Sequence, residues 1–424
     1  MIEKYKNNYS SISFFLALLF IITPIIISIY NSIFGDKSYT FWYVYIVNIG
    51  MLSLMNGLLG YKLKYKKIDK VIILFLLALL LSFIAMLVSG NILRSFIGSQ
   101  LRHSAFLTYV CFLGFFLNTI LINKDDYKKI VNVFIIITVL MCIISLLQNT
   151  ITFKLFYYNS YPNTAKVNYP YNAIYYNANH FGYYLSFAVL IIIFMLFNST
   201  GWKKLLYLLS YSICTYTLIV NNTFGAYLGV LLMLPLVGIF AIKDKKKMDY
   251  LIVLTIFIIC SVFITYHGFY VVKNNFQELF GSSGTSNVKV LYDDAGRGRV
   301  GIWKKYIGYI KESPIVGYGG ENTANKFLEE HISPRSPHNS IIEIAAYNGI
   351  PCLLLYLAGL IIMFIRYFKR KKFDLKTTGV FLAVGAYFIS SMFGNMTYYI
   401  SPYLVILLGL LFNLEKGEEN EKSS

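Results

Sequence analysis

Long apolar runs recur from one end of this 424-residue chain to the other, and almost none contains an ionisable side chain. Charged residues make up 14% of the chain, whereas soluble domains usually carry about 25%. A helix that crosses a bilayer needs roughly 17 to 25 apolar residues, because lipid offers its backbone no hydrogen-bonding partner. We therefore expect an all-α polytopic membrane protein.

Twelve apolar segments are long enough to be transmembrane helices, and the turns between some of them are very short. We predict spans at residues 11–33, 41–61, 71–89, 105–122, 130–150, 180–198, 204–221, 223–242, 250–268, 340–367, 377–397 and 400–414.

The basic residues support this count and indicate an orientation. With both termini in the cytoplasm, the inner segments hold 24 of the 38 Lys and Arg residues and the short outer loops hold five. Inner loops of membrane proteins carry this excess of positive charge. The net charge of +18 is therefore read as a topology signal and not as a nucleic-acid footprint. The predicted location is the cell membrane, with several passes and cytoplasmic termini.

On this topology the chain has three parts. Residues 1–268 hold the first nine helices and a Tyr- and Asn-rich outer loop at 151–179. Residues 269–339 form a large extracytoplasmic loop, which we expect to be catalytic. Residues 340–424 hold the last three helices and a short cytoplasmic tail. The five cysteines lie in apolar segments without Cys-x-x-Cys spacing, so neither disulfides nor a metal site is expected.

The Tyr- and Asn-rich segment extends over residues 153–184 and contains prolines that interrupt helix formation. Tyrosine rings can stack on sugars and asparagine amides can bind hydroxyl groups. Interfacial belts of tyrosine are equally general in membrane proteins. The segment is thus a candidate glycan-facing surface and also a candidate membrane anchor.

The large outer loop is expected to contain short helices. Apolar residues recur at helical spacing from Val300 to Ile310 with lysines between them, which is typical of an amphipathic helix on a membrane surface. A Gly-Tyr-Gly-Gly turn at 317–320 and a short helix near 323–331 follow. Two prolines then lead to His338, just before the next apolar run.

Two kinds of side chain in this loop suit a phosphate-bearing, hydroxyl-containing substrate. Arg297, Arg299 and Arg335 carry guanidinium groups, which bind phosphate oxygens in bidentate fashion. Contact with lipid headgroups would explain any one of them as well. His338 could take a proton from a hydroxyl near neutral pH, and Asn339 could orient its ring or bind a sugar.

Several other kinds of site are disfavoured. No GxxxxGK[ST] or GxSxG motif occurs, and the Asp293-Asp294 pair has no histidine at metal-ligand spacing. A sugar donor should therefore be lipid-linked and should need neither metal nor cofactor. The helix centres contain almost no charged residue, which disfavours a proton-coupled transporter.

Four short motifs together resemble one family. They are Gly298-Arg299 with Trp303, Pro314 to Gly319, His338-Asn339 with Gly349-Ile350, and Asn177-Ala178-Asn179. They are similar to the GRxxxW element, the PxxGxG turn, the HN helix entry and the N-x-N segment of the O-antigen ligase and polymerase family. These are bacterial surface-polysaccharide enzymes, and the first three motifs come in order within the one outer loop.

The resemblance implies a metal-independent membrane glycosyltransferase whose donor is a glycan on polyprenyl diphosphate. His338 would deprotonate the acceptor hydroxyl, and Arg299 would stabilise the leaving diphosphate. The residues implied to bind substrate are Arg297, Arg335, Asn339, Asn177, Asn179, His180, Gly317 and Gly319.

Two positions depart from the family pattern. Arg297 stands where members often have serine, and Phe224 stands where ligase members carry an arginine. The second departure favours a polymerase that joins repeat units of a capsule or O-antigen, with a ligase as the alternative. A flippase or transporter of lipid-linked sugars is the alternative from another class. Expected partners are the lipid-linked donor and acceptor, the bilayer and a conceivable chain-length regulator protein, without nucleic acid.

Overall fold

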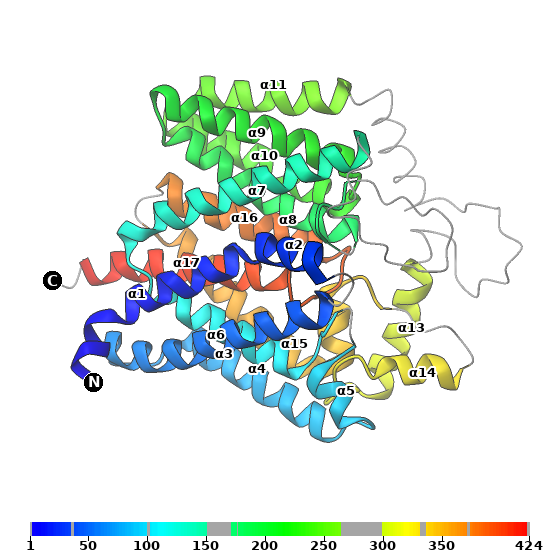
Figure 1. Cartoon of the computed structure of the whole chain (residues 1–424). Coiled ribbons are helices and arrows are strands. Elements are labelled where there is room, and N and C mark those ends of the chain that lie inside the picture. Colours follow the sequence, from blue (N-terminus) through cyan, green and yellow to red (C-terminus); the bar gives the residue numbers. More distant parts are fainter. Residues whose placement is uncertain are drawn as a thin grey trace, which may run out of the picture.

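The computed structural model describes residues 2–34, 38–99, 102–150, 171–175, 177–263, 299–330, 336–370 and 374–421. Every regular element in these ranges is a helix, and the long helices lie side by side in one bundle (Figure 1). The expected all-α membrane architecture is therefore confirmed.

The helices are numbered as in Figure 1. The longer ones are α1 (Ile2–Ile21), α2 (Thr23–Phe34), α3 (Ser38–Lys64), α4 (Lys70–Leu87), α6 (Phe106–Ile120), α7 (Tyr127–Thr150), α8 (Ala178–Phe197), α9 (Gly201–Asn221), α10 (Phe224–Lys243), α11 (Lys247–Phe263), α15 (Ser340–Phe368), α16 (Leu375–Ser391) and α17 (Ser401–Glu421). The shorter ones are α5 (Ile92–Ile97), a 3-10 turn (Lys124–Asp126), α13 (Arg299–Glu312) and α14 (Thr323–Glu329).

Each of the predicted spans overlaps a helix, although residues 264–268 lie outside the described ranges and residues 392–397 follow the end of α16. Not all of these helices qualify as spans. Among the described residues, six are long and apolar enough to cross a membrane: α3, α4, α7, α8, α10 and α15. A seventh results if α1 and α2, which are bent by 47° at a break, count as one. The helices α6 and α17 are apolar but shorter. The count of twelve thus stays a prediction.

The two ends of the bundle differ. The beginning of α1 and the end of α17 lie at one end, whereas α5, α13 and α14 lie at the other (Figure 1). We call the second end the loop face. If the termini are cytoplasmic, as the basic residues predict, the loop face is extracytoplasmic.

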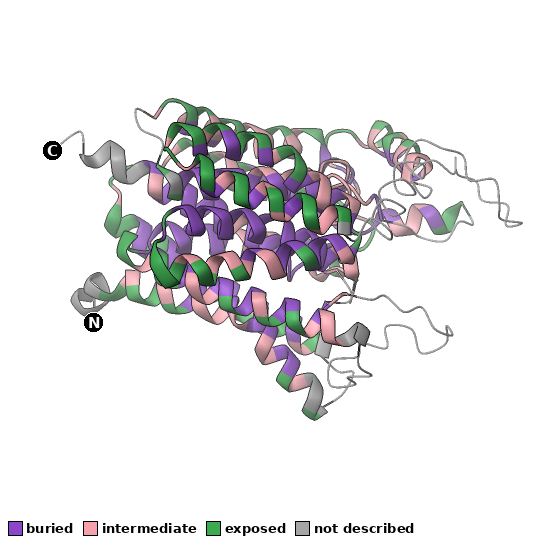
Figure 2. Cartoon of the chain, turned by 90° about the horizontal axis from the view of Figure 1, so that it is seen from above, coloured by how far each residue is buried: buried purple, intermediate pink, exposed green. Residues whose placement is uncertain are grey.

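The centre of the bundle is α8. Every residue from His180 to Phe197 is buried, with α9, α10 and α16 packed around it. Figure 2 shows buried residues on the central helices and exposed ones on the outer helices. Many exposed residues on α3, α4 and α9 are leucines. Apolar side chains on so much of the outer surface suit contact with lipid rather than water.

Helix α15 is broken near its middle by its own sequence and by a contact with the turn at 314–319. Gly349 has φ 84°, outside the helical range, and Pro351 follows it. The turn at 314–319 pairs with this break: Tyr318 and Gly319 donate backbone hydrogen bonds to the carbonyls of Ala346 and Tyr347. The PxxGxG turn and the Gly-Ile pair are therefore two halves of one packing contact.

Helix α13 forms where the loop pattern predicted one, but it buries a different face. Ile302, Tyr306 and Tyr309 are buried against Phe327 of α14 and Tyr347 of α15. The expected lipid-facing stripe ran through Val300 and Ile307 instead. The reason is the packing of Tyr306, Tyr309 and Tyr347. Their large rings bury more apolar surface against one another than a helix lying on a flat membrane surface could bury. The loop helices are thus anchored to the bundle.

Candidate active site

The connection between α16 and α17, residues 392–400, organises the loop face. Asn395 contacts His338, and the backbone N–H of Met396 donates to Glu343. Tyr398 donates its backbone N–H to the carbonyl of Arg102. Tyr399 contacts His180 through its hydroxyl. Groups from four distant parts of the sequence meet at this connection, which the hydropathy pattern had shown only as a short turn.

His338 lies in a left-handed backbone conformation, with φ 47°. Its backbone N–H donates to Oδ1 of Asn395 at 2.9 Å, and Nδ2 of Asn395 lies 3.2 Å from the ring Nδ1. Since Oδ1 faces a fixed donor, the amide NH₂ must face Nδ1, which therefore accepts. The neutral ring then carries its proton on Nε2, the nitrogen that lies 3.4 Å from the Ser336 hydroxyl.

Asn339 caps α15. Its Oδ1 accepts hydrogen bonds from the N–H groups of Ile341 and Ile342 at 3.0 and 3.1 Å. This is the usual function of asparagine at an N-cap, where the first N–H groups of a helix have no backbone partner. The ring-orienting contact that we expected of Asn339 is made by Asn395.

Arg299 begins α13, and this helix is joined to the histidine loop. The indole N–H of Trp303 donates to the carbonyl of Pro337 at 2.7 Å, directly before His338. Arg299 itself is half-buried. The arginine of one motif therefore lies on a helix that is hydrogen-bonded to the residue before the histidine of the other.

The N-x-N segment starts the central helix. Oδ1 of Asn177 accepts from the N–H of Asn179 at 2.9 Å and so caps α8. Oδ1 of Asn179 accepts from the Thr223 hydroxyl at 3.3 Å. His180 is buried, and its Nδ1 lies 2.5 Å from the hydroxyl of Tyr399. All three residues lie at the loop face, and all three also have structural partners.

Gly317 and Gly319, expected to bind substrate, have a packing explanation. Both have positive φ, and a Cβ on Gly317 would lie 2.6 Å from the backbone of Tyr347. A Cβ on Gly319 would lie 2.2 Å from the Ser95 hydroxyl. Side chains cannot be accommodated at these positions, so glycine is required there whether or not a ligand binds.

Two buried carboxylates were not among the predicted site residues. Glu321 accepts from the backbone N–H groups of Ser99 and Ser104, both at 2.8 Å. Glu343 accepts from the Ser104 hydroxyl at 2.5 Å and from the backbone of Met396 at 2.9 Å. Together they fix the loop before α6 to the rest of the loop face. The sequence did carry a signal for Glu343, because an acidic side chain near the start of an apolar run indicates a possible functional residue.

Arg102 is the cation of this cluster. Its Nη2 lies 4.0 Å from Oε2 of Glu321, and within the described ranges the guanidinium has no closer ion-pair partner. Burial acts to lower the pKa of Arg102, but the negative charges of Glu321 and Glu343 raise it above its ordinary value. Arg102 therefore stays charged at any physiological pH.

Arg297 and Arg335 lie outside the described residues, as do His331 and the Tyr-rich residues 151–170. Phe224, the position that departs from the ligase pattern, packs edge-on against Phe393, with ring centroids 5.4 Å apart. The described ranges contain no group of three or more His, Cys, Asp or Glu side chains that could hold a metal ion.

Residues 209–357 match the model of a protein family described as O-antigen ligase. This match supports the resemblance to the O-antigen ligase and polymerase family that the four motifs indicated. The matched range runs from α9 into α15 and includes Phe224, Arg299, His338 and Gly349. Members of the O-antigen ligase and polymerase family are glycosyltransferase-like enzymes, and the several long apolar helices of this chain indicate a multi-pass membrane protein. No curated protein matches the chain.

Proposed function

We propose that this protein is a polysaccharide polymerase of the cell membrane. It transfers a glycan from polyprenyl diphosphate to a sugar hydroxyl on an acceptor repeat unit, in the synthesis of a capsule or O-antigen. The observation that supports the proposal is the hydrogen bond from Trp303 of α13, the helix that Arg299 begins, to the carbonyl directly before His338. Such a site combines a group that can exchange a proton with one that can bind phosphate.

In the proposed reaction His338 takes the proton of the acceptor hydroxyl as its oxygen attacks the anomeric carbon of the donor. The bond between that carbon and the diphosphate oxygen breaks, and the polyprenyl diphosphate leaves with the electron pair. Arg299 offsets the charge that develops on the leaving oxygens. Arg102 is a second cation at the loop face that could contribute to the same task.

Base catalysis by His338 requires a change at Asn395. In the resting arrangement the proton lies on Nε2, so this nitrogen donates and does not accept. The Asn395 amide must release Nδ1, and the proton must move to Nδ1, before Nε2 can act as a base. Hydrogen bonds of catalytic groups commonly rearrange in this way when substrate binds.

Two arguments support a lipid-linked donor and an extracytoplasmic reaction. The candidate residues lie at the end of the bundle opposite both termini (Figure 1), and the basic residues predict cytoplasmic termini. Nucleotide sugars are made in the cytoplasm, so a donor at this face must have crossed the membrane on a lipid. The proposal therefore includes cytoplasmic termini, an extracytoplasmic active site and a reaction that needs no metal ion.

A polymerase is favoured over a ligase by the surroundings of Phe224. Where ligase members carry an arginine, this chain places a phenylalanine ring against Phe393. The position is apolar and cannot bind diphosphate. A polymerase and a ligase differ in the acceptor, so the products in cells distinguish them.

The deciding experiment analyses surface glycans in a strain that lacks this protein. We expect single repeat units at the surface, with long polymer restored by the wild-type chain. Full-length polymer stranded on its lipid carrier would show a ligase instead. Complementation with His338→Ala should leave the polymer at least about a hundredfold below wild type. Ile315→Ala, an exposed change in the same loop region, is the matched control, and both proteins are quantified in membranes.

Metal independence is tested in the same assay. Transfer in purified membranes should be unchanged by excess EDTA, because two side chains supply the proton transfer and the charge stabilisation. Loss of transfer that Mg²⁺ restores would contradict this part of the proposal.

A further inference from the structure

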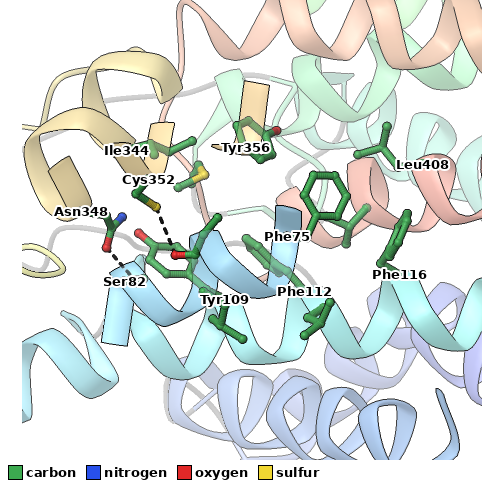
Figure 3. A pocket seen from close by; sticks show the side chains of 15 residues that line it. Phe75, Ser82, Tyr109, Phe112, Phe116, Ile344, Asn348, Cys352, Tyr356 and Leu408 are labelled. Atoms are coloured by element: carbon green, nitrogen blue, oxygen red, sulfur yellow. Dashed lines mark hydrogen bonds between the residues drawn. The ribbon is translucent and has the colours of Figure 1, made fainter. Parts of the chain in front are cut away.

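An apolar cavity of about 120 Å³ lies inside the bundle, between α4, α6, α15 and α17 (Figure 3). Its lining is almost entirely aliphatic and aromatic. Neither the motifs nor the proposed chemistry accounts for it. Packed interiors contain few voids of this size, since empty space forfeits dispersion contacts.

The cavity is elongated along the helices. On α15 its lining residues are Ile344, Asn348, Cys352 and Tyr356, each four positions after the last. Twelve residues of unbroken helix would correspond to roughly 18 Å, and the break at Gly349 lies within this stretch. On α6 the lining from Tyr109 to Phe116 covers about 10 Å. The space therefore runs from near the loop face toward the middle of the bundle, which is the direction of a lipid chain in a membrane.

Several polar atoms of the lining have hydrogen-bond partners. The Ser82 hydroxyl donates to Oδ1 of Asn348 at 2.8 Å, and the Cys352 thiol contacts the carbonyl of Ala78 at 3.3 Å. Figure 3 shows Ser82 and Asn348 paired toward one end and Phe116 and Leu408 toward the other. With these groups satisfied, the walls offer water little to bind, and apolar cavities of this order stay dry and take apolar ligands.

One end of the cavity lies beside the candidate active site. Met396 lines it, and its neighbour Asn395 contacts the His338 ring. The backbone of Met396 is bound by Glu343, which also binds Ser104. The hydroxyl of Tyr109, another lining residue, lies 3.3 Å from that of Ser104. A chain in the cavity would thus leave it between His338 and the cluster that contains Arg102.

We propose that the cavity holds the first part of the hydrocarbon chain of the donor lipid, next to its diphosphate. The inference rests on the proposed function, because it assigns a place to the lipid of that donor. The chain lies along α15, and its headgroup emerges at the α16–α17 connection. The cavity thereby sets the height of the reacting carbon relative to His338, and it selects donors by their chain.

The test narrows the cavity. Ala78→Leu adds bulk from α4, and Cys352→Leu adds it from α15 in case the first variant is unstable. Leu80→Phe enlarges a lipid-exposed residue of α4 that does not line the cavity and is the control. Rates are measured in detergent for a long-chain polyprenyl donor and for a short-chain analogue whose lipid is too short to enter the cavity, with the same glycan. Thermal unfolding confirms that each variant is folded.

We expect the narrowed variants to raise KM for the long-chain donor about tenfold, which corresponds to lost contact with two methylene groups. Their kcat, and both constants for the short-chain analogue, should stay within about twofold of wild type. An equal loss for both donors, or no loss for either, would overturn the proposal. If the wild-type chain transfers glycan from neither donor, the proposed function itself has failed, which is a different result.

A second readout identifies the occupant directly. A donor with a diazirine on its first isoprene units should label peptides containing Phe112 or Tyr356, and unlabelled donor should compete. A phospholipid with the same group on its acyl chain serves as the comparison. Equal labelling by the phospholipid, without competition by donor, would show that ordinary bilayer lipid fills the cavity, and the proposal would be wrong.

Discussion

Asn395 controls which ring nitrogen of His338 is available, and two substitutions separate the possible roles of that histidine. In Asn395→Asp both carboxylate oxygens accept, so one can bind the backbone N–H and the other an Nδ1–H. The proton then moves to Nδ1 and frees Nε2. If His338 is a base, this variant should keep at least wild-type transfer, while Asn395→Leu should lose tenfold or more, about the lower range for such contacts.

The opposite pattern would indicate that His338 works as an N–H donor to an anionic oxygen. Asn395→Asp would then be impaired, and His338→Gln, which retains a donor, would be more active than His338→Ala. Initial rates of all four variants in one membrane preparation decide between the two roles.

Arg299 gives a second prediction at this scale. Arg299→Lys keeps the positive charge but cannot hold two phosphate oxygens in one plane. We expect transfer to fall by about ten- to a hundredfold, mainly in kcat, because the interaction strengthens as charge develops on the leaving group. The control is Lys304→Arg, a little over one turn further along α13, and it should leave the rate unchanged. A fall confined to KM would contradict a role in the transition state.

Among the elements, α15 shows how a motif can describe packing rather than chemistry. A Cβ on Gly349 would lie 2.0 Å from the carbonyl oxygen of Ile315, and the residue has a positive φ. Gly349→Ala should therefore destabilise the fold by about 1–3 kcal/mol and displace the loop that leads to His338. Gly308→Ala, in α13 with open space around it, should be neutral or slightly stabilising. Thermal unfolding in detergent compares the two; equal melting temperatures would exclude the proposed strain.

The sequence predicted helix positions well, because apolar run length depends on local composition alone. It missed the bend between α1 and α2, although Pro24 lies at the start of the second helix and is a known cause of such breaks. It also missed Asn395, Glu321 and Arg102. Each acts through partners more than fifty residues away. Such contacts leave no periodic trace, so only the assembled fold reveals them.

For the whole molecule, the prediction concerns which end of the bundle faces the cytoplasm. In a background without native cysteines, Ile315→Cys at the loop face and Lys247→Cys at the start of α11 are both exposed positions. A membrane-impermeant maleimide should label the first in intact cells and the second only after permeabilisation. The reverse result would place the candidate site in the cytoplasm and remove the argument for a lipid-linked donor.

The α16–α17 connection also constrains how the enzyme is made. Tyr399 stacks on Trp42 of α3, Tyr398 packs edge-on against Tyr43, and Asn395 holds His338. These partners are all synthesised earlier than the connection itself. The chain can thus insert most of its helices while its reactive groups remain unassembled. On the proposed function, we expect a chain truncated before this connection to be inactive in the glycan assay.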